Sequence, residues 1–258
     1  MHHDAFCSRA VALVSIVGLG LAIATAAAQS PSTTKQVKVL VLTGNDYPGH
    51  KWKETAPLVA RFLAADPRLA TSVNDDPKFL ASARLFDYDV VVLHYMNWKS
   101  PDPGDEARAN LAKYVAGGKG LVLVHFACGA FQGWPEFARI AGRIWNPKLR
   151  GHDPRGPFTV VIADAEHPIT KGLQPFGTDD ELYTCLEGDK DIHVVVTATS
   201  KIDKKEYPIA FVNQYGKGRV FHCVLGHDVK ALSFDAVEEL YRRGTAWAAG
   251  LPPVAGGK

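Results

Sequence analysis

The chain has 258 residues, 47% of them hydrophobic, and its 29 basic side chains nearly balance 27 acidic ones, which leaves a formal charge of +2. Because basic and acidic side chains are nearly equal in number, the charge gives no reason to expect nucleic acid or an anionic membrane surface as a partner. The length fits one large domain with a substantial core.

The amino terminus indicates export. Arg9 precedes an apolar run from Ala10 to Ala28 that closes with three alanines, the small-residue pattern that signal peptidase accepts. We expect cleavage there, which would make the protein periplasmic or secreted and leave no stable membrane span. The alternative is an uncleaved anchor helix, because the run approaches the length that spans a bilayer. The expected parts are a signal peptide (1–28), a flexible lead-in (29–36), one domain (37–250) and a tail (251–258).

Strands and helices are expected to alternate in the first half. Nearly continuous aliphatic runs predict strands buried on both faces, and apolar residues at helical spacing predict helices. The expected elements are a strand at 37–42, a helix at 53–65, a strand at 89–93, a helix at 105–115 and a strand at 120–124. This alternation predicts an α/β fold with right-handed crossovers and an open, mostly parallel sheet covered by helices on both faces.

The second half has a different character. Strand-like segments at 158–163 and 192–199 precede a β-hairpin, whose strands at 208–214 and 219–225 flank a Gly-containing turn. A closing helix is expected at 234–249. No composition change marks a second domain.

Polar residues gather after the expected strands. In an open parallel sheet, ligands bind outside the carboxyl ends of the strands, where the following loops converge. Several imidazoles at one edge suit proton transfer, metal ligation or hydrogen bonding to sugar hydroxyls. The candidates for this edge are His50, His94, His125, His152, His227, Asp180 and Glu181, with Trp98, Trp134 and Trp145 in loops nearby.

We predict a catalytic role for three of these histidines, His125, His152 and His227, with Asp180 or Glu181 as acid or base. The same three histidines are the candidate ligands of a divalent metal such as zinc, with a carboxylate completing the site. No tight spacing such as His-x-x-x-His supports a metal, so the prediction depends on convergence in the fold.

Substrate contacts are predicted from His50, His94, Trp98 and Trp134. The alternatives are structural roles: a histidine at a strand end can donate to backbone carbonyls, and a tryptophan can pack in the core. His222, within a strand-like run, is interpreted as structural.

Signal cleavage leaves three cysteines, Cys128, Cys185 and Cys223. An odd number in an oxidising compartment allows one disulfide at most, and the sequence does not say which two would pair.

Seven short segments carry a family resemblance. They are Gly49-His50-Lys51-Trp52, the run from Gly118 to His125, Gly151-His152, His167-Pro168-Ile169-Thr170, Asp180-Glu181-Leu182-Tyr183, the run from Gly216 to Phe221, and Leu225-Gly226-His227-Asp228. Together they resemble the ThuA-like (trehalose utilisation) family over about Val37 to Gly250. The resemblance implies a flavodoxin-like fold related to class I glutamine amidotransferases and a sugar or glycoside as partner. It implies no established reaction.

The amidotransferase relationship raises Cys128 as a candidate nucleophile. A nucleophile elbow needs small neighbours, and Gly129 and Ala130 qualify, but Phe126 stands where a glycine is wanted. The usual His-x-Glu partner does not follow, so His227 with Asp228 would have to substitute.

Three functions remain open. The favoured one is an exported hydrolase, lyase or isomerase that acts on a glycoside or an oxidised sugar derivative. The second is a non-catalytic sugar-binding protein that uses the same edge, and the third is an amidotransferase-like enzyme that depends on Cys128.

Overall fold

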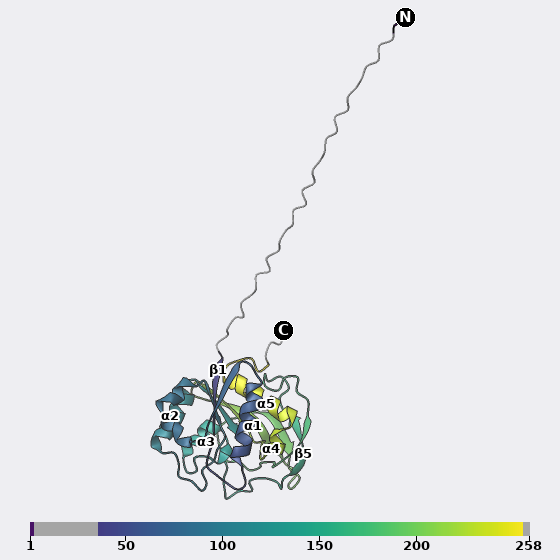
Figure 1. Cartoon of the computed structure of the whole chain (residues 1–258). Coiled ribbons are helices and arrows are strands. Elements are labelled where there is room, and N and C mark those ends of the chain that lie inside the picture. The colour runs from purple at the N-terminus through teal and green to yellow at the C-terminus, as the bar shows by residue number, and fades with distance from the viewer. Residues whose placement is uncertain (3–35, 255–258) are drawn as a thin grey trace. The chain divides into compact units, whose positions relative to one another are not determined.

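A nine-stranded sheet organises the protein (Figure 1). The computed structural model describes residues 1–2 and 36–254, so nearly all of the expected signal peptide and of the lead-in, and the end of the tail, lie outside the described residues. The strand order is β2-β1-β3-β4-β9-β8-β7-β5-β6. The strands are β1 (Val37–Leu42), β2 (Leu69–Asn74), β3 (Val90–Leu93), β4 (Gly120–Val124), β5 (Gly156–Ile162), β6 (Phe176–Asp180), β7 (His193–Thr199), β8 (Glu206–Tyr215) and β9 (Gly218–Cys223).

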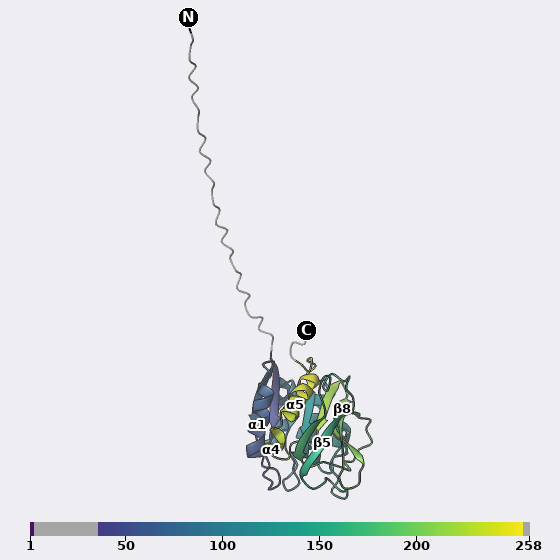
Figure 2. The same cartoon turned by 90° about the vertical axis from the view of Figure 1, so that its right-hand side faces the viewer.

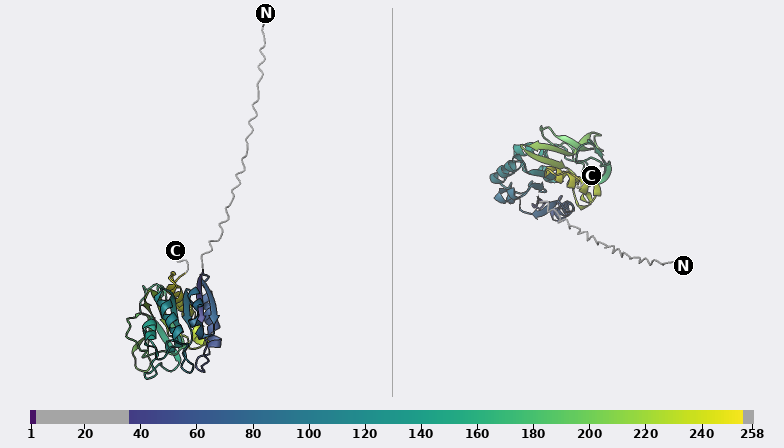
Figure 3. Two further views of the ribbon diagram at one scale, coloured as in Figure 1. Left: turned by 90° about the vertical axis from the view of Figure 1, so that its left-hand side faces the viewer. Right: turned by 90° about the horizontal axis from the view of Figure 1, so that it is seen from above.

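Helices cover both faces of the parallel strands (Figures 1 and 3). The α-helices are α1 (Trp52–Ala64), α2 (Asp105–Ala116), α3 (Pro135–Ala141), α4 (Val229–Leu232) and α5 (Asp235–Ala248). The 3₁₀ helices are η1 (Pro77–Ala81), η2 (Ala83–Asp87) and η3 (His125–Gly129).

Five strands, β2-β1-β3-β4-β9, pair in parallel. In chain order this is the 2-1-3-4-5 arrangement of flavodoxin-like sheets, with β9 as the fifth strand. The register aligns Leu42 with Leu93, Leu93 with Leu123, and Val124 with Cys223. These strands therefore end at nearly one level, and the residues that follow them meet at one edge.

Alternate residues of each parallel strand face opposite helical layers. Val39 and Val41 belong to the core formed with α1 and α5, whereas Leu40 and Leu42 belong to the core formed with α2 and α3. Because side chains alternate across a strand, burial on both faces requires an unbroken aliphatic run.

The antiparallel strands β8, β7, β5 and β6 extend the sheet beyond β9 (Figure 2). Direction reverses at each of these four pairings, so β6 runs in the same direction as β9. The end of β6 and the residues before β5 therefore come to the carboxyl edge of the parallel strands. This extension is what delivers Glu181 and His152 to that edge.

The fold-class prediction is confirmed, including the hairpin, which is β8–β9. Strands β2 and β6 and helix α4 were not predicted. β2 buries one of its six residues and β6 reads Phe-Gly-Thr-Asp-Asp, so neither has the aliphatic run that marks the central strands. No helix in the described part of the chain is both long enough and apolar enough to cross a membrane.

Candidate functional site

His125 follows β4 in a strained turn. Its φ is +44°, in the left-handed region that non-glycine residues rarely adopt, and it begins η3. The side chain is fully buried, and Nδ1 lies 2.7 Å from the backbone oxygen of Val224. A carbonyl only accepts, so Nδ1 carries the hydrogen and the neutral ring has its lone pair on Nε2. Nε2 has no hydrogen-bond partner.

Asp180, the last residue of β6, ties that strand to the loop after β9. Its buried carboxylate accepts hydrogen bonds from the backbone N–H groups of Gly226 (2.6 Å), His227 (3.1 Å) and Glu181 (2.8 Å). Burial raises the pKa of Asp180, and these three donors oppose the rise. With its oxygens occupied, Asp180 positions His227 and Glu181 rather than exchanging protons with a ligand.

Backbone pairing fixes His152 beside Glu181. His152 forms an isolated antiparallel bridge with Tyr183, and Asp153 N–H donates to the oxygen of Leu182 at 2.9 Å. His152 Nδ1 lies 2.8 Å from the Asp153 carbonyl oxygen, so it too carries the hydrogen and leaves Nε2 as an acceptor.

The carboxylate of Glu181 is the point of convergence. Its Oε2 lies 3.2 Å from His227 Nδ1 and 3.6 Å from His125 Nε2, and its Oε1 lies 3.7 Å from His152 Nε2. His125 and His152 both point a lone pair at this carboxylate. Acceptors that face one another in a buried site call for a proton or another cation between them.

His50, from the loop after β1, completes the group. Neither of its ring nitrogens has a hydrogen-bond partner, although both are buried. Its ring lies 5.1 Å from those of His125 and His227 and stacks on Phe126 at 4.3 Å. One ligand atom from each of His50, His125, Glu181 and His227 lies within 4.8 Å of the others. We call these four residues the histidine–carboxylate cluster.

Protonation in the cluster follows from burial and neighbouring charge. Burial, followed by repulsion from His125 and His227, lowers the pKa of His50 to about 2, so that ring stays neutral. Burial alone would raise the pKa of Glu181, but its contacts with His125 and His227 outweigh burial and hold the pKa below the usual value. Glu181 in turn raises the pKa of His227. The result is an ionised carboxylate among imidazoles, which is the donor set of many zinc and other transition-metal sites.

The structure therefore brings together five of the predicted residues, His50, His125, His152, His227 and Glu181. The set of residues that converge differs from the expected ligand set at one position, where His50 takes the place of His152. His50, expected to contact substrate, lies within the cluster, whereas His152 lies at its margin, with a side chain that is 35% exposed.

His94 lies below the cluster. It is fully buried and packs edge-on against Phe126, at 5.1 Å. The Thr43 hydroxyl donates to the His94 carbonyl oxygen at 2.9 Å and lies 3.0 Å from Nδ1, so it accepts from the ring. Burial lowers the pKa of His94 to about 3. Although His94 Nε2 has no hydrogen-bond partner, the complete burial of the ring favours packing over substrate contact.

Aromatic side chains border the cluster. Trp98 is 37% exposed and lies 5.8 Å from Tyr47 and 5.3 Å from Trp145. Trp145 packs on Gly151, where a Cβ atom would lie 1.7 Å from the indole, and reaches the ring of His152 at 6.0 Å. We call Tyr47, Trp98 and Trp145 the aromatic rim. Trp134 lies apart, stacked on Phe137.

Cys128 is fully buried within η3, and burial raises the pKa of its thiol. The residue that occupies the strained turn after β4 is His125, not Cys128. Neither feature favours the nucleophile hypothesis. Cys128, Cys185 and Cys223 are all free.

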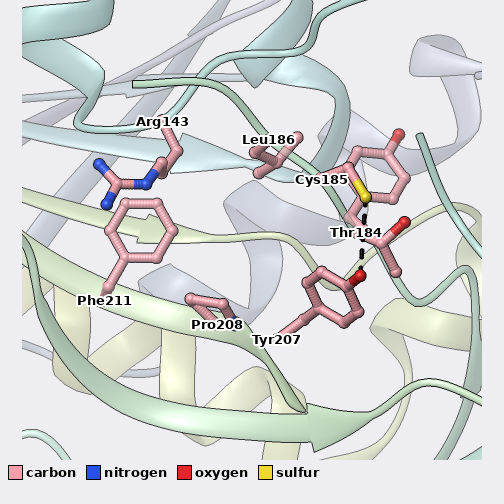
Figure 4. Close-up of a pocket in the computed structure, with 8 residues that line it drawn as sticks. Arg143, Thr184, Cys185, Leu186, Tyr207, Pro208 and Phe211 are labelled. Carbon is pink, nitrogen blue, oxygen red and sulfur yellow. Dashed lines mark hydrogen bonds between the residues drawn. The ribbon is translucent and has the colours of Figure 1, made fainter. Parts of the chain in front are cut away.

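Sequence reasoning missed Tyr183, whose ring lies 4.3 Å from that of His125. The only indication in the sequence that Tyr183 lies at the site was its position two residues after Glu181. Tyr183 also lines a separate cavity of about 110 Å³, in which the Cys185 thiol lies 3.6 Å from the Tyr207 hydroxyl (Figure 4). That volume has room for a few water molecules, so this cavity is too small for a sugar.

The fold and the cluster define a class: flavodoxin-like α/β proteins with a histidine–carboxylate site at the carboxyl edge of the sheet. The ThuA family model, described as trehalose utilisation, matches residues 38–248. The chain belongs to this family. Among proteins of curated function, none matches the sequence.

Solved structures agree with this assignment. A putative ThuA-like protein from Parabacteroides merdae is 27% identical, with a TM-score of 0.73 over 84% of this chain and 92% of that one. A putative ThuA-like protein from Bacteroides uniformis is 18% identical, with a TM-score of 0.67 over 87% and 97%. A β-galactosidase from Rahnella sp. R3 (18% identity, TM-score 0.57) matches 84% of this chain but 32% of its own length, and shares the fold alone.

Proposed function

We propose that this protein is a metal-dependent enzyme that acts on a glycoside or an oxidised sugar derivative, with a divalent metal ion held by the histidine–carboxylate cluster. The observation that carries the proposal is the convergence of unpartnered imidazole nitrogens on the Glu181 carboxylate within 4.8 Å. A buried polar atom without a partner is costly, and three imidazoles and a carboxylate can each satisfy that need by binding one cation.

Tautomer control supports metal binding. A metal-bound histidine almost always donates its other ring N–H to a carbonyl or carboxylate, which fixes the ring. His125 meets this condition through Val224, and the neutral state of His50 suits a ligand because a protonated imidazole cannot bind a metal.

The sugar part of the proposal rests on the aromatic rim and on the family's description as trehalose utilisation. Indole and phenol rings offer flat apolar faces with a polar edge, which suits the C–H face and hydroxyls of a pyranose. Trp98 and Trp145 lie where a sugar approaching His152 would meet them.

Each residue then has a role. When bound, a divalent ion would polarise a sugar oxygen or acidify a water molecule. His125, His227 and His50 hold their nitrogens toward one point. Glu181 offers Oε2 to that point and turns Oε1 toward His152, which at 35% exposure can pass a proton between the carboxylate and a substrate oxygen. The amino-terminal run of the sequence supports action in the periplasm or outside the cell.

Turnover tests this proposal. The mature protein would be incubated with trehalose, a chromogenic α-glucoside and carbonyl-oxidised forms of both, before and after chelation. We expect chelation to lower turnover by at least about 100-fold, zinc or manganese to restore it, and His125→Ala and His227→Ala to lower it as far.

His222→Asn and Cys128→Ser serve as controls and should stay within about threefold of the unmodified protein. Turnover that survives chelation would overturn the metal assignment. Loss in Cys128→Ser alone would restore the thiol hypothesis, and saturable sugar binding without any product would leave a sugar-binding protein.

A further inference from the structure

A groove beside α3 adjoins the aromatic rim through Trp145. It has a volume of about 1000 Å³, and its walls are the segments 132–139, 144–148 and 187–189. This volume is at the upper end of the ~300–1,000 Å³ of small-molecule sites, so it exceeds what one sugar ring fills. Nothing in the proposed chemistry of the cluster requires it.

Trp145 connects the groove to His152, at the margin of the cluster. It lines the groove, and its ring also packs against His152 and Tyr183, at 6.0 and 5.2 Å. The indole of Trp145 therefore borders both His152 and the groove, so a ligand of several sugar units that starts at His152 can extend over Trp145 toward the groove.

Two indole N–H groups are free along this path. Trp134 and Trp145 both line the groove, and within residues 36–254 neither indole nitrogen donates to a protein acceptor. An indole N–H usually finds a partner when it is covered, so these two are available to ligand hydroxyls.

Two polar side chains of the groove, Asn146 and Glu187, hold each other in place. Asn146 Nδ2 donates to Glu187 Oε2 at 2.8 Å, and Asn146 Oδ1 accepts from the backbone N–H of Lys148 at 2.8 Å. Glu187 itself is anchored by two backbone hydrogen bonds to Ile144, each 2.8 Å. Glu187 Oε1 remains free to accept. Fixed carboxylate and amide groups beside aromatic faces form hydroxyl-binding sites at little entropic cost.

We infer that the groove binds the further sugar units of an oligosaccharide whose terminal unit lies at the histidine–carboxylate cluster. The inference rests on the proposed function, because the cluster supplies the sugar that the groove extends. A peptide would need apolar pockets or free backbone partners, and the two indole N–H groups with a fixed carboxylate match hydroxyls better.

Calorimetric titration tests the inference. The metal-loaded His152→Gln variant, which keeps the four residues of the cluster but lacks the proposed proton relay, would be titrated with glucose, trehalose, maltotriose and maltotetraose, so that no turnover disturbs binding. We expect maltotetraose to bind at least about tenfold more tightly than glucose, since each stacked ring adds contact area.

The double variant Asn146→Ala/Glu187→Ala should lose this gain with chain length, so that the dissociation constants of the whole series come together. Trp134→Leu gives a second test through an apolar replacement that keeps contact with Phe137. The exposed pair Glu166→Ala/Lys171→Ala is the control and should keep the full gain.

The outcomes separate the two proposals. If glucose and maltotetraose bind equally well, the groove assignment is wrong while the cluster assignment stands. If long chains bind and the groove variants abolish the gain, but the unmodified protein turns over no sugar, the groove stands and the enzyme does not. If no sugar of any length binds, both fail.

Discussion

Two histidines of this protein share full burial and the same side-chain hydrogen bonding but differ in their surroundings. His125 and His222 are both fully buried, and each donates its Nδ1 hydrogen to a backbone carbonyl, of Val224 at 2.7 Å and of Ala141 at 3.0 Å. Each leaves Nε2 without a partner.

Around His222 lies apolar core, with the ring of Phe211 at 4.6 Å. Around His125 lie Glu181, His50 and His227. Burial and a hydrogen bond to a backbone carbonyl therefore do not distinguish a functional histidine from a structural one. The distinguishing feature is a carboxylate that several imidazoles approach at once.

The largest expected effect concerns the carboxylate that distinguishes the surroundings of His125, Glu181, compared with the adjacent Asp180. Glu181→Gln replaces a carboxylate that faces imidazole lone pairs with an amide that can donate to one of them. We expect this variant to lose metal binding, while its free energy of unfolding in the metal-free state changes by no more than about 1 kcal/mol, because an amide keeps a hydrogen bond to one of the histidines in place of the carboxylate's contacts. A loss of metal binding with little change in stability would mark Glu181 as a functional residue.

Asp180→Asn is the matched control. Asp180 accepts three backbone N–H groups, and an amide would turn its own N–H₂ toward one of them. This variant should lose about 1–3 kcal/mol in urea unfolding. If Glu181→Gln lost as much stability as Asp180→Asn, the distinction between a positioning and a functional carboxylate would be wrong.

The second prediction concerns acid. Burial lowers the pKa of His222 to about 4, whereas an unfolded histidine titrates near 6.5. Below pH 6.5 the unfolded chain takes up this proton and the folded chain does not, so the contribution is complete above pH 6.5 and lost as pH falls toward 4.

His222→Asn keeps a donor for the Ala141 carbonyl but does not titrate. Between pH 6.5 and 5, with chelator present, its free energy of unfolding should fall by about 2 kcal/mol less than that of the unmodified protein. Equal losses in the two proteins would show that His222 is protonated in the folded state.

The smallest effect concerns Arg155. Its guanidinium bridges Asp179 and Asp228, each 2.8 Å away. Asp179 lies two residues before Glu181 of the cluster, and Asp228 directly follows His227. Partly exposed ion pairs contribute little, so Arg155→Met should weaken metal binding by about two- to fivefold. Lys171→Met, which breaks an exposed ion pair with Glu166, is the control. A loss of metal binding in Arg155→Met as large as that in His125→Ala would mean that Arg155 does more than position its neighbours.

Much of the parallel sheet could be predicted because burial on both faces leaves aliphatic runs such as Val37–Leu42. Strand β6 could not, since its Asp179 and Asp180 serve the site rather than the core. The edge strand β2 buries too little to leave a pattern.

The site could be predicted as a collection of candidates. His125 and His227 follow strands, and the rule on carboxyl ends places them together. The role of His50 could not be read, because the path of the loop from Thr43 to Lys51 depends on packing against Phe126. Asp180 and Glu181 look equivalent in sequence, and only the backbone donors around Asp180 separate them.

The most direct test of the central claim is elemental analysis of the mature protein, exported into a periplasm and purified without a histidine tag. We predict close to one zinc, manganese or iron per chain, lost in His125→Ala and retained in His222→Asn. An absence of metal from protein loaded under saturating zinc or manganese, or equal metal content in both variants, would contradict the claim that the histidine–carboxylate cluster is a metal site.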